Sequence, residues 1–86
     1  MTTWRTLLID AMASHEESML DIVSSTMTAE QMDVEFDNGY GTEEGIPFTV
    51  WTHNRVYFPI CYDGAEWVGS ASRAPDGVAT VHQGGG

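Results

Sequence analysis

The strongest constraint on the fold of this chain is a change in the spacing of its apolar residues after Pro47. From there to Ala71 they recur at a period of two, which is typical of strands. The alternating runs occupy residues 48–51, 55–62 and 65–71. Two-residue turn sequences separate the runs, and they are His53–Asn54 and Asp63–Gly64. Because such short turns join antiparallel neighbours, the sequence predicts a three-stranded antiparallel meander in chain order.

The register of these strands predicts how the sheet faces are used. The turns place Thr52 opposite Arg55, and Tyr62 opposite Ala65. We expect the helices to cover the face that carries Trp51, Val56, Phe58, Ile60, Trp67 and Ala71. The other face carries Phe48, Val50, Tyr57, Pro59, Cys61, Glu66 and Val68. This second face is more apolar than a solvated sheet face normally is. Because Pro59 lacks an N–H donor, we expect a bulge or an unpaired edge at that residue.

The first helix is expected over residues 3–24. Apolar side chains recur there at three- and four-residue spacing, and polar residues occupy the opposite side. Thr2 or Thr3 is suited to cap its start. The segment Ser14–Glu17 is also a possible capping box, which would divide the helix into two. Because the apolar stripe continues through this segment without a change of phase, we predict one helix.

A second helix is predicted to begin after Thr28 and to end by Asn38–Gly39. Thr28 is a suitable N-cap, and Gln31 stands at the capping-box position. The methionines on either side of the cap, Met27 and Met32, have the spacing of a hydrophobic staple. Three carboxylates share one face of this helix at i, i+3 and i+7, and they are Glu30, Asp33 and Asp37. A glycine-rich loop over residues 39–46 then leads to the first strand.

The predicted fold class is α+β, with two N-terminal helices packed on a three-stranded antiparallel β-meander. A chain of 86 residues has room for one small core. We therefore predict a single domain over residues 1–73, followed by a turn and a flexible tail over residues 74–86. Within that tail, residues 78–81 could add a short edge strand, and the three terminal glycines are expected to be disordered.

The charge of the chain limits the partners that it can bind. Thirteen acids face three arginines and no lysine, which gives a formal net charge of −10. No Lys or Arg occurs between Arg5 and Arg55, an interval that holds ten of the 13 acids. Such a chain repels nucleic acid and anionic membranes, so a basic protein is the natural electrostatic partner. The alternative is that the acidity only keeps a small protein soluble.

The sequence contains no recognisable catalytic pattern. Cys61 and His53 lie at opposite ends of one predicted strand, roughly 20 Å apart, which is too far for a nucleophilic pair. Ser-His-Asp, phosphate-loop and zinc-ligand spacings do not occur. We therefore expect no enzymatic activity, no cofactor and no metal. The single cysteine excludes an internal disulfide, and the chain lacks a signal peptide or an apolar run long enough for a membrane span, so we expect a cytoplasmic protein.

Calcium binding is a further alternative. Asp33, Glu35, Asp37 and Glu44 occupy positions 1, 3, 5 and 12 of a loop of EF-hand length. The pattern departs from that of an EF-hand at the sixth position, where Asn38 replaces the turn glycine. The segment that follows, Gly45–Pro47, is unsuited to begin the second helix of such a motif.

Two exposed features are candidate binding sites for a partner. The first is the acidic segment, together with aromatic anchors, and its residues are Glu30, Asp33, Glu35, Asp37, Glu43, Glu44, Tyr40 and Tyr57. We expect these carboxylates to substitute for phosphates on a protein groove made for DNA or RNA. The second is the apolar sheet face that includes Phe48, Tyr57 and Val68. It favours an alternative function, a small intracellular interaction or assembly protein that binds through this face or forms a homodimer. The C-terminal tail could also cover this face.

The chain also resembles a class of known inhibitors. The segments that carry the resemblance are MTTWRTLLIDAM, the acidic TAEQMDVEFDNGYGTEE, and a compact meander that ends in YDGAEWVGS. In these the chain is similar to the small acidic phage-encoded proteins that inhibit bacterial defence systems, the anti-CRISPR proteins in particular. The class shares no single fold and no defining motif. The resemblance implies a target such as a Cascade-type effector complex in the host cytoplasm, whose DNA channel is lined with Lys and Arg.

Overall fold

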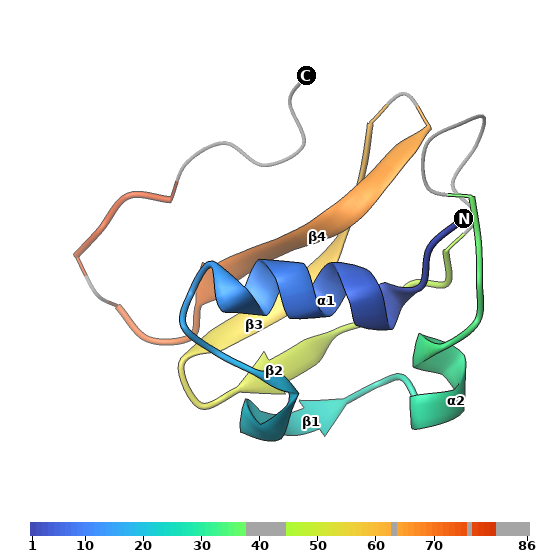
Figure 1. Ribbon diagram of the computed structural model, residues 1–86. Helices are drawn as coiled ribbons and strands as arrows, with labels where there is room; N and C mark the ends of the chain where they lie inside the picture. Colours follow the sequence, from blue (N-terminus) through green and yellow to red (C-terminus); the bar gives the residue numbers. More distant parts are fainter. Residues whose placement is uncertain (38–44, 63, 76, 81–86) are drawn as a thin grey trace.

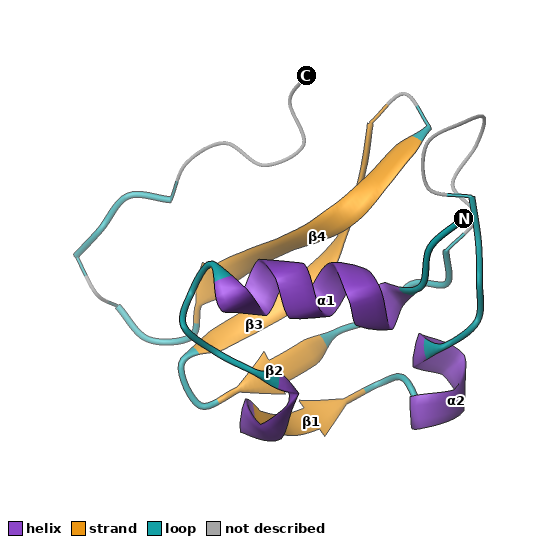
Figure 2. Ribbon diagram, in the orientation of Figure 1, coloured by secondary structure: helices purple, strands orange, loops and turns teal. Residues whose placement is uncertain are grey.

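A four-stranded antiparallel sheet supports the other elements in the computed structural model of this chain (Figure 1). The structure describes residues 1–37, 45–62, 64–75 and 77–80. The elements are α1 (Trp4–Ala13), the 3₁₀ turn η1 (Met19–Asp21), β1 (Ile22–Ser25), α2 (Ala29–Met32), β2 (Val50–Thr52), β3 (Arg55–Tyr62) and β4 (Ala65–Ser72). The strand order is β1-β2-β3-β4, and α1 crosses one face of the sheet (Figure 2). The α+β class is confirmed, with β1 as a strand that the sequence did not predict.

The β3–β4 hairpin has the predicted register. Eight residue pairs run without a shift from Arg55–Ser72 to Tyr62–Ala65. Gly64 in the connecting turn has φ +84°, a backbone conformation that glycine adopts without steric cost. At Pro59 the prediction of an unpaired edge is confirmed, because β2 begins at Val50, opposite Tyr57, and does not extend to Pro59.

The first helix is shorter than predicted. Helix α1 begins after the N-cap Thr3, whose side chain accepts a hydrogen bond from the Thr6 N–H, and it ends at Ala13. Glu16 then adopts φ +59°, which reverses the chain. The following residues form η1 and β1, and Ile22 of β1 pairs with Thr52 of β2. The prediction of one helix over residues 3–24 is therefore wrong, because residues 22–25 pair with β2, a distant partner that the local apolar spacing does not reveal.

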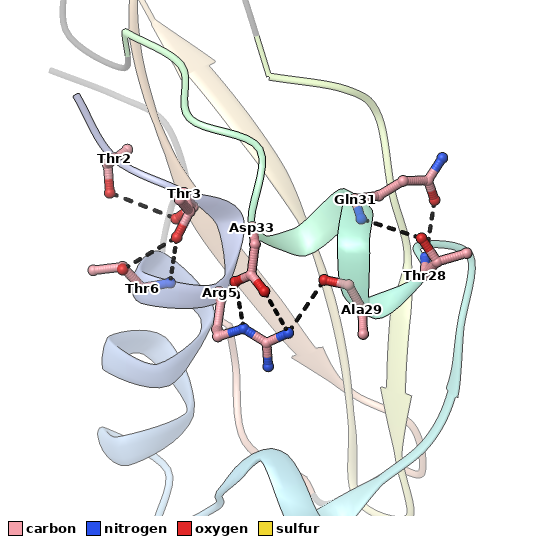
Figure 3. Close-up of polar contacts among 8 residues, drawn as sticks. All are labelled: Thr2, Thr3, Arg5, Thr6, Thr28, Ala29, Gln31 and Asp33. Carbon is pink, nitrogen blue, oxygen red and sulfur yellow. Dashed lines mark hydrogen bonds and ion pairs between the residues drawn. The ribbon is translucent and has the colours of Figure 1, made fainter.

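Helix α2 has the predicted cap and only one turn. The Thr28 hydroxyl accepts from the Gln31 N–H at 3.1 Å, and the Gln31 side chain accepts from the Thr28 N–H at 2.9 Å (Figure 3). The helix ends at Met32, and the chain then extends to Phe36, which forms a bridge with Thr2 at the N-terminus. The predicted helix to residue 38 is therefore wrong. Its predicted end, Asn38–Gly39, lies outside the described residues.

The core lies on the sheet face opposite to the predicted one. Trp4, Leu8 and Met12 of α1 are buried against a sheet face that presents Val50 and Tyr57. The other core residues are Met27, Met32, Phe36, Phe48 and Val68. This face also carries the buried polar residues Thr52, Glu66 and Ser70, which the alternation of apolar residues does not place in a core. Each of them obtains a hydrogen-bond partner that is distant in sequence.

The segment after β4 adds no strand in its described part. Residues 78–80 have no strand conformation, and Val81 and the terminal glycines lie outside the described residues. The helices of the described chain include none that is long and apolar enough to cross a membrane.

Candidate interaction surfaces

The acidic segment does not form the single helical face that its spacing predicts. Glu30 lies on α2 and is exposed, whereas Asp33 caps the end of this helix and Asp37 lies beyond the Thr2–Phe36 bridge. Because α2 ends at Met32, the predicted face shared by the three carboxylates does not exist. Glu35 is exposed, as expected. The remaining predicted residues of this segment, Tyr40, Glu43 and Glu44, lie outside the described residues.

Asp33 holds α2 against α1 through an ion pair. The Arg5 guanidinium donates through Nε to Asp33 Oδ1 at 2.6 Å and through Nη2 to Oδ2 at 3.2 Å. The same Nη2 also donates to the Ala29 carbonyl oxygen at 3.2 Å (Figure 3). The hydrogen bond from Arg5 lowers the pKa of Asp33, and the pKa of Arg5 is raised in turn. Arg5 therefore neutralises this carboxylate, which makes Asp33 a weaker contact for a partner than its acidic neighbours.

Most of the net charge belongs to residues 1–37, which we call the acidic N-terminal half. It holds eight of the 13 acids and one Arg, so it accounts for a formal −7 of the −10. Its exposed carboxylates are Asp10, Glu16, Asp21, Glu30, Asp33 and Glu35. Within the described part of the chain, Arg5–Asp33 is the only salt bridge. The acidic N-terminal half therefore keeps a largely uncompensated negative field.

The two other arginines bond to neutral oxygens. Arg55 donates to the Ser70 hydroxyl, and Arg73 donates through Nη1 to the Thr52 carbonyl oxygen at 2.6 Å. Both contacts are with the sheet, on β4 and β2. These arginines therefore contribute to the fold, and among the described residues Asp33 is the one exposed carboxylate with a basic partner.

Tyr57 is not on an open sheet face, and the prediction that it contacts a partner there is wrong. Its side chain is 0% exposed, because α1 covers this face. The Tyr57 hydroxyl donates to Glu17 Oε1 at 2.5 Å, and the equally buried Thr52 hydroxyl donates to Glu17 Oε2 at 2.8 Å. Burial, followed by the hydrogen bond to Glu17, raises the pKa of Tyr57. Glu17 is therefore an internal acceptor that fixes the chain after α1 to the sheet.

A second polar cluster, which the sequence did not indicate, lies beside the first. Arg55 donates to Ser70 Oγ through Nε at 3.2 Å and through Nη2 at 2.9 Å, and His15 Nε2 lies 3.2 Å from the same oxygen. Because two donors occupy the lone pairs of the hydroxyl, its proton points to His15 Nε2. This assigns His15 as a neutral acceptor. Burial and the charge of Arg55 lower the pKa of His15, and Glu17 opposes this change.

This cluster has some features of a nucleophilic site, but it is better suited to a structural role. It borders a cavity of about 390 Å³ that is also lined by Ser14, Ser72 and Thr80. Ser70 is only 6% exposed, and Arg55 binds both lone pairs of its oxygen. A serine nucleophile needs a lone pair that is free to attack a substrate. Because His15 and Ser70 are 55 residues apart, no local pattern could have predicted their contact.

The sheet has a second, outer face that α1 does not cover. We call it the outer sheet face, and its residues are Trp51, Val56, Phe58, Ile60, Trp67 and Ala71. The register places Trp51 opposite Val56, and Ile60 opposite Trp67. All six side chains are partly exposed, and none belongs to the core cluster. The prediction of an open apolar face with Phe48, Tyr57 and Val68 is therefore wrong, because these side chains are buried. The partly exposed apolar face is the one that was expected to lie under the helices.

The described residues do not assemble a metal site. No group of three or more His, Cys, Asp and Glu side chains comes close enough among them to hold an ion. In the predicted calcium loop, both Asp33 oxygens bind Arg5, and Glu44 lies outside the described residues. Cys61, the single cysteine, is an exposed free thiol at the end of β3.

Comparison of the chain with protein-family models, curated proteins and solved structures finds no match. Three features of the molecule itself therefore indicate what it can bind. These are the acidic N-terminal half, the two internal polar clusters and the outer sheet face.

Proposed function

We propose that this chain is a non-enzymatic inhibitor that binds a basic, nucleic-acid-binding protein surface through its acidic N-terminal half. The observation that carries the proposal is the uncompensated charge of that half, a formal −7 with one internal ion pair among the described residues. Exposed carboxylates attract a surface built for phosphates, because both present negative oxygens to Lys and Arg. The chain acts in this way as a mimic of DNA.

The proposed target is a bacterial effector complex of the CRISPR type, in line with the anti-CRISPR resemblance of the sequence. Such a complex presents a channel of basic side chains to DNA. Asp10 on α1, Glu30 on α2 and Glu35 beyond it are exposed, and their carboxylates accept no hydrogen bond from the described residues. These three side chains are therefore able to contact such a channel at no cost to the fold.

The test is competition with DNA. A purified Cascade-type effector is incubated with fluorescent target duplex, and the chain is added over a range of concentrations. We expect the chain to displace the duplex, and its affinity to fall as salt rises, because contacts between charged surfaces are screened. The variant Asp10→Asn/Glu30→Gln/Glu35→Gln is expected to inhibit about tenfold less strongly, because it lacks three carboxylates at the interface.

A matched control separates the position of the charge from its amount. The variant His53→Lys/Ala74→Lys/Thr80→Lys changes exposed residues outside the acidic N-terminal half. Both variants add three units to the formal charge of −10, so each carries −7. We expect the lysine variant to inhibit nearly as well as the wild type. Equal inhibition by both variants, or no displacement of the duplex by the wild-type chain, would show that the proposal is wrong.

A further inference from the structure

The outer sheet face is an apolar surface on a strongly charged chain, and its six side chains are each partly exposed. It presents two tryptophans, a phenylalanine, an isoleucine, a valine and an alanine on one side of β2, β3 and β4. The described helices lie elsewhere, with α1 on the opposite face (Figure 1). Contiguous apolar surface of this kind in a small protein marks an interaction site.

The absence of charged residues on this face allows a second copy of the same chain as the occupant. No Asp, Glu, Lys or Arg stands among the six residues of the face, so two copies can meet there without opposing like charges. Contact through any part of the acidic N-terminal half would place carboxylates against carboxylates. A basic protein, in contrast, would find no acid on the outer sheet face to pair with its cations.

The shape and size of the face fit a weak symmetric dimer. Twisted sheets pack face to face at about −30°, and a twofold interface uses the same patch on both copies. Strands β3 and β4 have eight residues each, about 26 Å at 3.3 Å per residue, and neighbouring strands lie about 4.8 Å apart. Because β2 adds only three residues beside the two longer strands, the face offers about 300 Å² per copy. This is well below the roughly 800 Å² of a standard interface, so the expected association is weak.

We propose that two copies of this chain pack through their outer sheet faces to form a face-to-face dimer. In this dimer α1, with the exposed carboxylate of Asp10, lies on the side of each sheet that faces away from the other copy. The inference does not depend on the proposed inhibitory function, since it concerns a different surface.

Sedimentation velocity over a concentration series tests the dimer. The mass is expected to rise from 9.4 kDa toward twice that value, and the dimer fraction is expected to grow with protein concentration. It should also grow between about 0.05 M and about 0.5 M NaCl, because salt screens the repulsion between two acidic chains. Binding to a basic partner has the opposite salt dependence. A chain that stays monomeric at high concentration and high salt would overturn the proposal.

Two glutamate variants locate the interface. Phe58→Glu places a charge in the middle of the outer sheet face, and its dimer is expected to be lost. Leu20→Glu is the matched control, because Leu20 is 96% exposed on η1, next to another apolar patch that includes Ile9. This control is expected to dimerise like the wild type. A dimer that survives Phe58→Glu, or that is lost in Leu20→Glu, would overturn the proposal in favour of another surface.

Tryptophan fluorescence gives a readout that does not depend on a folded Phe58→Glu variant. Trp51 and Trp67 are half-buried in the single chain, and Trp4 is only 1% exposed. Dimerisation should move the emission to shorter wavelength as concentration rises, and Trp51→Phe/Trp67→Phe should abolish this shift. Emission of the wild type that stays constant while its mass doubles would place the contact elsewhere and overturn the proposal.

Discussion

Replacing Glu17 with alanine should cost the fold about 2–3 kcal/mol, although Glu17 looks like an ordinary surface acid in the sequence. Its carboxylate is the acceptor for the Tyr57 hydroxyl at 2.5 Å and for the Thr52 hydroxyl at 2.8 Å, and both partners are 0% exposed. In Glu17→Ala the Thr52 proton can turn to the Arg55 carbonyl oxygen, 3.3 Å away. Tyr57 has no other acceptor among the described residues, so most of the loss comes from its buried hydroxyl.

Urea denaturation followed by circular dichroism measures this loss. A domain of this size has a free energy of unfolding of about 4–13 kcal/mol, so the midpoint should move clearly. Glu17→Gln keeps an acceptor and should lose less than Glu17→Ala. A double-mutant cycle of Glu17→Ala with Tyr57→Phe should give a coupling energy of about 1–2 kcal/mol. If Glu17→Ala stays within about 0.5 kcal/mol of the wild type, or if the two changes are additive, the assigned role of Glu17 is refuted.

Three further predictions follow from the same contacts. Gly45→Ala should destabilise the fold by about 1–3 kcal/mol in urea denaturation, because a Cβ there would lie 2.5 Å from the buried Trp4 ring. Because the pKa of His15 is lowered, its contribution to the free energy of unfolding is complete above pH 6.5 and is lost as the pH drops toward the folded-state pKa. His15→Gln should therefore flatten the acid side of a plot of stability against pH. Because the pKa of Tyr57 is raised, its contribution to the free energy of unfolding is complete below pH 10 and is lost as the pH rises further. Tyr57→Phe should remove this alkaline dependence of stability.

Elements that depend on neighbouring residues could be predicted from the sequence. The β3–β4 hairpin follows from Asp63–Gly64 and the alternation on either side, and its register was confirmed pair by pair. The cap of α2 follows in the same way from Thr28 and Gln31, which lie three residues apart. In both cases the partners are close in the chain, so local chemistry fixes the geometry.

Elements that depend on distant partners could not be predicted. Strand β1 was missed because Ile22 pairs with Thr52, 30 residues later, while the local apolar spacing continued to favour a helix. The core was predicted on the wrong face of the sheet, because the hydrogen-bond partners of Glu66 and Ser70 come close to them only in the folded chain. The clustering of acids in residues 1–37 is plain from the sequence. Which of their carboxylates share a face, in contrast, depends on where α2 ends.

The central claim is that carboxylates of the acidic N-terminal half contact a basic partner. Labelling of carboxyl groups, followed by mass spectrometry, tests it in the chain alone and in the chain bound to a Cascade-type effector. We predict that Asp10, Glu30 and Glu35 react readily in the free chain, where they are exposed, and lose reactivity in the complex. Unchanged labelling of all three in a complex that has formed would contradict it.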